Sequence, residues 1–396
     1  MNKKLLGSVF LLAGTAIGSG MLSLPIVLSK YGITLSFLIM LVFTWVTYFS
    51  SIVRCDLNIH SDSRFSLQDV GEYFSGNIAK QVGSISFKLL SYSLMAAYLH
   101  GAASLLNVFL NYDLRVTIVL LGIFAILVLL LNTTVIVKTN KTLFIVMMIA
   151  LFAVIFDMLS RFDFSNLNIP GISSNLSALT LLSALPIAFT AFGFQGSLHS
   201  MTKFLENDEK LIKKACFYGS LTPAIVYISW MSCVMFVVFN SSTEFFHKMI
   251  TSNVSVDELI LCLTNKLGSS HLKSIMCVIS ALALSTSAIG VGVAIFDEWK
   301  YSFEKKSHNS KIIPAIISIV PPILIAATVE NAFIRVLNIS GIILSVIAIF
   351  LPCSLYIEMA KIKHLPITKE RMAGMIVLTI IGILICISGV VDLLQM

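Results

Sequence analysis

The sequence predicts an all-α integral membrane protein that forms a single transmembrane domain over residues 1–396. Two observations predict this class. First, 57% of the residues are hydrophobic and only 12% are charged, which gives a mean hydropathy of +0.94 and excludes a soluble globule. Second, many runs without charge are long enough to cross about 30 Å of hydrocarbon. The eleven runs are 5–29, 31–53, 89–112, 116–137, 142–160, 177–202, 215–243, 274–296, 312–329, 336–357 and 372–391. Because the fifth run holds Asp157 near one end and the ninth is short, eleven is the expected number to within one.

The basic residues predict how the chain is oriented. With the N-terminus inside, 20 of the 27 lysines and arginines fall in loops on the inner side. The seven on the outer side are Lys30, Arg115, Arg161, Lys248, Lys266, Lys273 and Arg335. Because cytoplasmic loops carry an excess of Lys and Arg, we expect a cytoplasmic N-terminus and, after eleven spans, an external C-terminus. The same scattered loops account for the net charge of +7, so no nucleic-acid partner is expected.

The first span contains three glycines at the depth where a membrane helix should be most regular, namely Gly14, Gly18 and Gly20. Glycine disfavours helix, so this segment can open and expose carbonyl and amide groups to a cavity. In secondary transporters such openings hold the substrate and the coupling ion. The alternative is that the Gly14-xxx-Gly18 pattern is a small-residue face for close helix packing. The first span alone does not separate these interpretations.

Two loops carry helical patterns of their own. In the second loop, Ser66 and Asp69 form an S-x-x-D capping pattern and precede apolar residues at helical spacing, which predicts a short cytoplasmic helix against the bundle. The longest outer loop, residues 244–270, has Val256, Leu259, Ile260 and Leu263 at helical spacing. It is expected to form either a cap over the outer mouth or a plain surface helix.

The sixth span repeats the irregularity of the first. Residues 189–197, which read FTAFGFQGS, place glycines and a polar side chain at mid-depth, after Pro186, which should itself disturb the helix. Interrupted segments at matching positions of two halves indicate an inverted-repeat transporter with its site between the breaks. We therefore predict a five-plus-five inverted repeat with discontinuous helices 1 and 6. Repeat one covers about 5–160, repeat two about 177–357, and an extra C-terminal helix about 372–391.

The sequence lacks motifs that are typical of several other function classes. There is no Walker-type phosphate loop, no H-E-x-x-H and no G-x-S-x-G, and the mid-membrane carboxylates that an intramembrane hydrolase needs are missing. The seven cysteines are dispersed without C-x-x-C or Cys/His clusters and are interpreted as packing residues. A channel should show a repeated polar ring, whereas this chain has two unlike breaks. No enzyme activity and no cofactor are expected.

Three segments carry a family resemblance. Residues 13–25, which read AGTAIGSGMLSLP, resemble the first helix of the hydroxy and aromatic amino acid permeases, specifically the bacterial tyrosine and tryptophan permease branch of the amino acid-polyamine-organocation superfamily. Residues 189–197 resemble the broken sixth helix of that group, where histidine is frequent at the position of Gln195. A third block, residues 205–215 followed by Gly219, Ser220, Pro223, Tyr227 and Trp230, is similar to the family's inner loop and seventh helix. The resemblance covers essentially the whole chain.

This resemblance implies the inverted-repeat fold of leucine-transporter-like proteins and ion-driven uptake of an aromatic amino acid. It also implies a multi-pass protein of the bacterial inner membrane, with a small amino acid and the lipid bilayer as its partners. Tyrosine is the expected substrate and tryptophan the next, while serine or threonine carriers of the wider family stay open as an alternative. The oligomeric state is not predicted.

The two breaks suit a zwitterion. Unpaired amides and the helix N-terminus near Ile17, Gly18, Ser19 and Gly20 would attract a carboxylate. Carbonyls near Thr190 would accept an ammonium, and aromatic and amide side chains would receive and orient an aromatic ring. The predicted substrate-binding residues of the two breaks are Thr15, Ala16, Ile17, Gly18, Ser19, Gly20, Thr190, Ala191, Phe192, Gly193, Phe194 and Gln195.

The third span adds Tyr92 and His100 to the predicted substrate-binding residues, with Tyr98 between them. An ionisable group at bilayer depth is rare and usually faces a cavity or a partner. His100 is therefore expected to couple a proton, to orient the substrate hydroxyl, or to bond a neighbouring helix.

The coupling ion has two candidates. The resemblance implies a proton, because the bacterial aromatic permeases are generally proton symporters. The rival is sodium: Thr286 and Ser287 resemble the hydroxyl pair that binds sodium in related transporters, together with carbonyls at Gly14, Ile17 and Ala283. The alternative role of these hydroxyl residues is helix packing.

Overall fold

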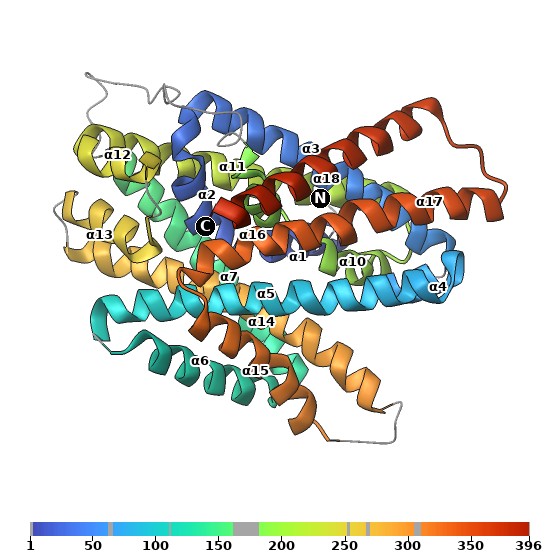
Figure 1. The fold of residues 1–396 in the computed structure, drawn as a ribbon, viewed down its shortest axis with the longest axis horizontal. Coiled ribbons are helices and arrows are strands. Elements are labelled where there is room, and N and C mark those ends of the chain that lie inside the picture. Colours follow the sequence, from blue (N-terminus) through green and yellow to red (C-terminus); the bar gives the residue numbers. More distant parts are fainter. Residues whose placement is uncertain are drawn as a thin grey trace.

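The computed structural model describes residues 3–61, 66–110, 112–160, 182–251, 254–266, 270–304 and 310–395, and within these ranges the chain is helical with no strand. Figure 1 shows the helices running largely side by side along one long axis. The helices are α1 Lys3–Ala16, α2 Ser19–Leu28, η1 Ser29–Tyr31, α3 Gly32–His60, α4 Leu67–Ser75, α5 Asn77–Leu110, α6 Leu114–Leu129, α7 Thr133–Ser160, α9 Leu185–Ala191, η3 Gln195–Ser197, α10 Leu198–Phe204, α11 Glu209–Ser241, α12 Thr243–Thr251, α13 Val256–Lys266, α14 Ser270–Glu304, α15 Ile312–Thr328, α16 Ala332–Ser345, η4 Val346–Phe350, α17 Leu351–Ile362 and α18 Lys369–Gln395.

Length and apolar composition confirm the predicted membrane class. Within the described ranges, seven helical runs are long and apolar enough to cross a bilayer, and α6 and α15 are shorter apolar helices. The first of these runs, Ser19–His60, joins α2 and α3 through η1 and covers the end of the first predicted span and all of the second. The count of eleven spans stays a prediction. Residues 177–181, where repeat two is predicted to begin, lie outside the described residues.

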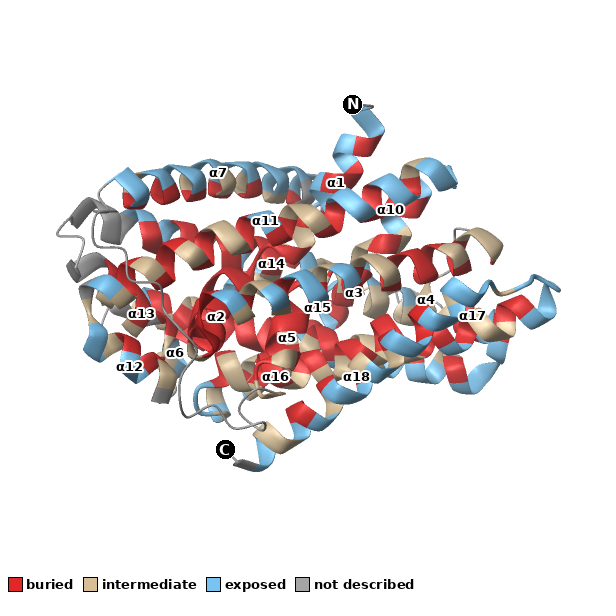
Figure 2. Cartoon of the chain, turned by 90° about the horizontal axis from the view of Figure 1, so that it is seen from above, coloured by how far each residue is buried: buried red, intermediate tan, exposed pale blue. Residues whose placement is uncertain are grey.

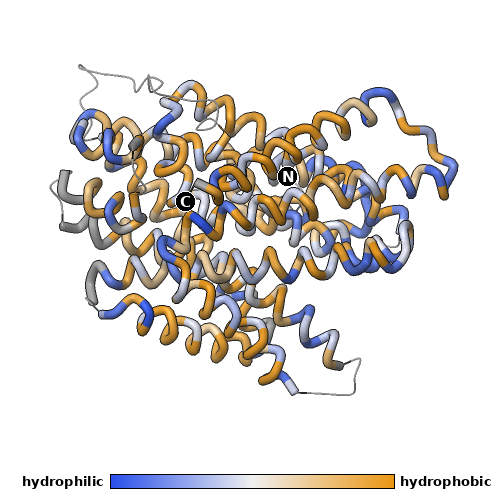
Figure 3. The backbone as a smooth tube through the Cα atoms, in the orientation of Figure 1, coloured by the Kyte–Doolittle hydropathy of each residue, from blue (hydrophilic) through white to orange (hydrophobic). Residues whose placement is uncertain are grey.

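The exposed surface of the outer helices is apolar, as a lipid-facing surface must be. On α7, for example, Ile149, Phe152 and Phe156 are exposed at helical spacing. Figure 2 shows this helix with one exposed and one buried side, whereas α2, α5 and α16 are largely buried at the centre. Figure 3 shows hydrophobic residues along the middle of the helices and hydrophilic residues at many of the turns.

We name the two ends of the bundle by the short helices that lie there. The α4 end carries α4 and the turn between α17 and α18, and the α13 end carries α12 and α13 (Figure 1). The predicted capping box is present in α4, where Ser66 accepts from the amide of Asp69 and Asp69 accepts from the amide of Ser66. Val70 and Phe74 of α4 are buried against α3 and α17, which confirms the predicted short helix against the bundle.

The helix α13 is more deeply packed than a plain surface helix. Val256, Leu259, Ile260 and Leu263 are all buried, and α13 packs against α2, α5, α11 and α14. The apolar residues predicted at helical spacing in the 244–270 loop therefore form a helix that covers the α13 end of the bundle. This arrangement places α13 next to the first broken helix.

Both predicted helix breaks are present. The first separates α1 from α2 at Ile17 and Gly18, and the second separates α9 from α10 at residues 192–197, which contain a single 3-10 turn, η3. The helix α2 packs against α9, and α11 packs against both α1 and α2. The fold thus brings two open segments, about 170 residues apart in sequence, to the middle of one bundle.

Candidate functional site

The first break lies in close contact with α14. A Cβ atom built on Gly18 would overlap Ser287 Oγ on α14, so no larger residue fits at position 18 unless that side chain moves. Gly18 also has φ −161° and ψ −113°, which is outside the helical region. The packing interpretation and the opened-helix interpretation of these glycines are therefore both realised, and at the same residue.

The second break follows the short helix α9, which has Pro186 in its first turn, where a proline does not disturb a helix. The helix α9 ends at Ala191. Phe192 and Phe194, which follow it, are non-helical and fully buried. A Cβ atom on Gly193 would lie 2.9 Å from Leu344 Cδ2 and 3.1 Å from the carbonyl oxygen of Thr190. The chain thus turns in a narrow space between α9 and α16, where a larger side chain would displace Leu344.

One side chain on α11 connects the two breaks. The Tyr227 hydroxyl lies 2.7 Å from the carbonyl oxygen of Ala16, where α1 ends, and 3.0 Å from that of Ala191, where α9 ends. One turn further along, Trp230 Nε1 donates to the carbonyl of Met21 in α2 at 2.6 Å. Sequence reasoning did not single out these two residues as site residues, because a buried Tyr and Trp in an apolar helix look the same as core residues.

Hydroxyl groups surround the first break. Thr15 Oγ1 lies 2.7 Å from Ser197 Oγ, which ties the end of α1 to η3. On the α2 side, the Tyr98 hydroxyl lies next to the hydroxyl groups of Ser19 and Ser287. These contacts place Tyr98, rather than Tyr92 or His100, at the break.

Gln195 is buried in the second break. Its Nε2 donates to Ser50 Oγ of α3 at 3.4 Å, while its Oε1 has no hydrogen-bond partner. Phe192 packs edge-on against the Tyr227 ring, with 5.4 Å between centroids. Thr190 Oγ1 donates within its own helix, to the carbonyl of Pro186 at 2.8 Å, and approaches the carbonyl of Leu337 on α16 at 3.2 Å.

Two residues of the predicted sodium site lie beside the first break, where Ile17 also lies. Ala283 and Ser287 lie against Gly18, and Thr286 Oγ1 donates to the carbonyl of Ala283 at 3.1 Å. Gly14 lies in the last turn of α1, and the position of its absent side chain faces Phe144 of α7 at 3.6 Å. Within the described residues no group of three His, Cys, Asp or Glu side chains forms a metal site.

Tyr92 lies away from both breaks. Its hydroxyl donates to the carbonyl of Ile317 on α15 at 3.0 Å and accepts from Trp299 Nε1 on α14 at 2.8 Å. These bonds join α5 to α14 and α15. The sequence predicts how deep a residue lies along a membrane helix, but not toward which neighbouring helix its side chain points. Tyr92 points away from the first break.

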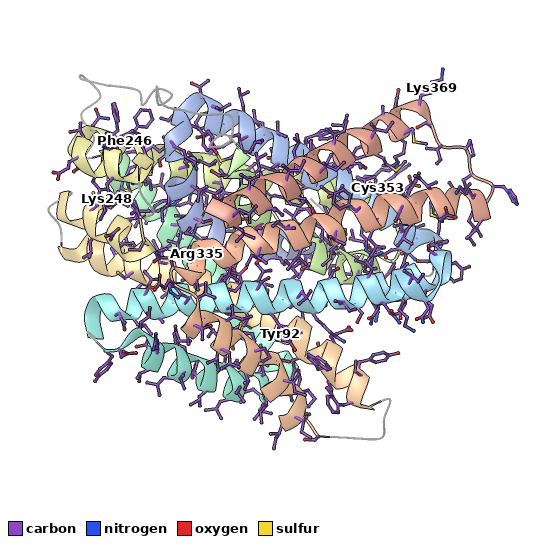
Figure 4. All side chains as sticks on the ribbon, in the orientation of Figure 1. Tyr92, Phe246, Lys248, Arg335, Cys353 and Lys369 are labelled. Carbon is purple, nitrogen blue, oxygen red and sulfur yellow. The ribbon has the colours of Figure 1, made fainter. Side chains whose placement is uncertain are left out.

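His100 lines a hollow of about 450 Å³ near the α13 end, together with Ser104 and Arg335. Val254 and Val256, at the start of α13, form another part of its wall. Figure 4 places Arg335 toward the α13 end and Tyr92 further along the bundle. No acidic residue lines the hollow among the described residues, and Arg335 contributes a positive charge to a wall that is otherwise largely apolar.

Comparison with known proteins identifies the family. Residues 1–392 match the model of the tryptophan/tyrosine permease family. The chain is 28% identical to the tyrosine-specific transport system 1 of Haemophilus influenzae, over 97% of this chain and 96% of that protein. It is 29% identical to glutamine transporter 2 of Aliivibrio fischeri, over 91% and 90% of the two chains, and 26% identical to the tryptophan-specific transport protein of Pseudomonas aeruginosa, over 88% and 84%.

Among solved structures, the chain resembles a point mutant of the manganese transporter of Eremococcus coleocola, with a TM-score of 0.59. The alignment has 14% sequence identity and covers 97% of this chain and 84% of the other, so it shows a shared fold. The family match over nearly the whole chain confirms the resemblance of the three sequence segments. The chain belongs to the tryptophan/tyrosine permease family and is a membrane transporter, not an enzyme.

Proposed function

We propose that the protein imports an aromatic amino acid, tyrosine first and tryptophan next, by alternating access, and that it binds the amino acid between the two helix breaks. The observation that carries this proposal is the Tyr227 hydroxyl, which lies within hydrogen-bonding distance of the last carbonyls of both α1 and α9. Two opened helices that meet at one hydroxyl can respond together when a ligand enters between them.

The α-carboxylate of the substrate would bind at the start of α2. This helix runs for ten residues from Ser19, and its first amides and its dipole favour a negative charge. Gly20 lies in its first turn, where a Cβ atom would be 2.6 Å from both Ala191 Cβ and the Tyr227 hydroxyl. Because glycine has no side chain, the backbone segments of the two breaks can lie close together at this position.

The α-ammonium group would bind the carbonyls that end α1 and α9. A tyrosine hydroxyl has a single proton, so Tyr227 can donate fully to only one of the Ala16 and Ala191 carbonyls. The other carbonyl is available to a second donor, and a substrate ammonium supplies three.

The aromatic ring would lie among Phe192, Phe194 and Gln195. Both phenylalanines are fully buried, and the unpartnered Gln195 Oε1 can accept a hydrogen bond from a phenol or an indole. Opening of the packed centre would be needed to admit the ring, as in alternating access.

We propose a proton as the coupling ion, on the resemblance to proton-driven relatives, with sodium as the rival. The rival is supported by Ser287, whose Oγ is buried beside the first break and next to the Tyr98 hydroxyl, with no hydrogen bond of standard geometry. A hydroxyl with a free lone pair is a suitable oxygen ligand for a hard cation.

We also propose the bacterial inner membrane as the location, with the N-terminus and the α4 end cytoplasmic and the α13 end and the C-terminus external. The excess of basic residues in the loops assigned to the inner side supports this orientation. A reporter enzyme that is active only outside the cytoplasm, fused after residue 395, should be active; inactivity there would reverse the orientation.

Glutamine is the second candidate substrate. The relative from Aliivibrio fischeri is named a glutamine transporter and is as similar to this chain as the tyrosine-specific relative. A competition assay with all twenty amino acids, under separate proton and sodium gradients, tests the proposal. We expect labelled tyrosine to be taken up under a proton gradient and displaced by tryptophan. Uptake of glutamine with no displacement by aromatic amino acids would overturn the aromatic assignment.

A further inference from the structure

One face of α3 is polar and buried inside the bundle. Thr47, Ser50, Arg54 and Asn58 follow one another at intervals of three or four residues, so they share a helical face. Thr47, Ser50 and Asn58 are at most 1% exposed, and Arg54 is 5% exposed. The face extends for about 17 Å along the helix. Ser50 contacts Gln195 of the second break, and Leu57, next to Asn58, packs with α4.

Most polar atoms on this face lack partners. Thr47 Oγ1, Arg54 Nη1 and both amide atoms of Asn58 have none, and Ser50 is contacted by Gln195 from the second break. None of the ion pairs formed between described residues includes Arg54. The neighbouring Asp56 pairs with Arg371 of α18 instead.

Apolar clusters lie on both sides of this face. Cys55 belongs to the cluster formed with α1, α10 and α11, and Leu57 belongs to the cluster formed with α4 and α17. A guanidinium between such clusters is costly to bury without a counter-charge. A membrane protein retains such a group where another conformation gives it water or an anion.

We propose that Arg54 and Asn58 form a second carboxylate-binding site, on the route between the second break and the α4 end, which holds the substrate carboxylate when the α4 end opens. This inference rests on the proposed function. A guanidinium binds a carboxylate through two parallel hydrogen bonds, and the Asn58 amide offers a further donor. In the structure, Gln195 of the second break donates to Ser50, so this bond would have to break for the route to open.

The first test measures access and does not need a known substrate. In a full-length chain whose seven native cysteines are replaced by serine, Asn58→Cys is exposed to small anionic and cationic thiosulfonate reagents from the α4 end. We expect modification, several-fold faster by the anionic reagent, and loss of this preference when Arg54→Gln is added. Ile52→Cys, on the apolar opposite face of α3, is the matched control and should stay unmodified. If Asn58→Cys is unreactive while the protein cycles, the face is only structural and the proposal is overturned.

The second test compares tyrosine with tyrosinamide, which lacks the charged carboxylate, as competitors applied at either end in oriented vesicles. At the α4 end, Arg54→Gln should reduce the preference for tyrosine by about tenfold, the loss expected for one charge-assisted pair. At the α13 end the preference should not change, because the start of α2 sets it. Arg54→Lys should keep part of the preference. Lys213→Gln, at an exposed cation paired with Glu209 in the first turns of α11, is the control and should have no effect.

A further measurement distinguishes a substrate carboxylate from an inorganic anion as the ligand of Arg54. If replacing chloride by gluconate impairs the wild type but not Arg54→Gln, and the preference for tyrosine is unchanged, the site serves an inorganic anion and the carboxylate proposal is overturned. Failure of every aromatic amino acid to be transported would refute the proposed function, while the reagent test would still report on the site. If Arg54→Gln does not insert into the membrane, Arg54→Lys provides the comparison, since it keeps the charge.

Discussion

Gly18 in the first broken helix lies so close to Ser287 on α14 that the serine hydroxyl occupies the place where a side chain at position 18 would begin. This contact joins the opened segment of α1 and α2 to the helix that carries the candidate cation ligands. It makes a substitution at Gly18 a direct test of whether the break has to fit closely against α14.

Replacing Gly18 by leucine should abolish uptake while leaving membrane insertion intact, because the side chain would push α14 away from the break. Gly18→Ala should act in the same direction, and adding Ser287→Gly should restore part of the uptake by removing the overlapping atoms. The measurement is labelled tyrosine uptake, normalised to the amount of protein in the membrane. The control is Gly290→Ala, since nothing lies within 4 Å of the added atom there. Normal uptake by Gly18→Leu would show that the close contact is not needed for transport.

Replacing Tyr227 by phenylalanine removes the hydroxyl that contacts both breaks. We expect uptake to fall by at least about tenfold and the free energy of unfolding to fall by about 1–2 kcal/mol, because a buried carbonyl loses its donor. Thermal unfolding of the purified variant and tyrosine uptake are the two measurements. Tyr218→Phe, an exposed tyrosine on the same helix, should change neither. Full activity of Tyr227→Phe would mean that the link between the breaks is dispensable.

Gln195 should affect which substrate is preferred more than whether transport occurs. Because its unpartnered Oε1 is the proposed acceptor for the substrate ring, Gln195→Leu should lower the preference for tyrosine over phenylalanine by about tenfold. Gln195→His should keep much of the preference, since a ring nitrogen of histidine can also accept a hydrogen bond. Competition of phenylalanine against labelled tyrosine measures the effect. An unchanged preference in Gln195→Leu would remove this residue from the site.

The identity of the ion can be tested with the hydroxyl residues of α14. If the proton is the coupling ion, tyrosine should accumulate in sodium-free vesicles under an imposed pH gradient. Thr286→Ala should then leave the accumulation within about twofold, because its hydroxyl bonds only the carbonyl of Ala283. A strict need for sodium, with a raised half-saturating sodium concentration in Thr286→Ala, would establish the rival.

The positions of the breaks were predictable because their physical cause is visible in the residue types. At Gly18 and Gly193 an added Cβ atom would come too close to neighbouring atoms, and Pro186 lies in the first turn of the short helix before the second break. The short helix α4 was equally predictable, since its capping box is a local pattern.

The side chains that surround the breaks were harder to predict. Tyr98 and His100 are neighbours on α5, yet one lies at the first break and the other lines the hollow near α13. Which side of a buried helix faces the site depends on the packing of helices distant in sequence, and an apolar helix has no strong periodic pattern to reveal it. For the same reason, the sequence did not identify Tyr227 as a residue of the site.

The central claim is that the substrate lies between the two helix breaks, and a structure determined with bound tyrosine tests it most directly. The account predicts tyrosine with its carboxylate at the start of α2 near Ser19, its ammonium at the carbonyls of Ala16 and Ala191, and its ring beside Phe192. Tyrosine bound only in the hollow lined by His100 and Arg335, with the two breaks unchanged, would contradict it.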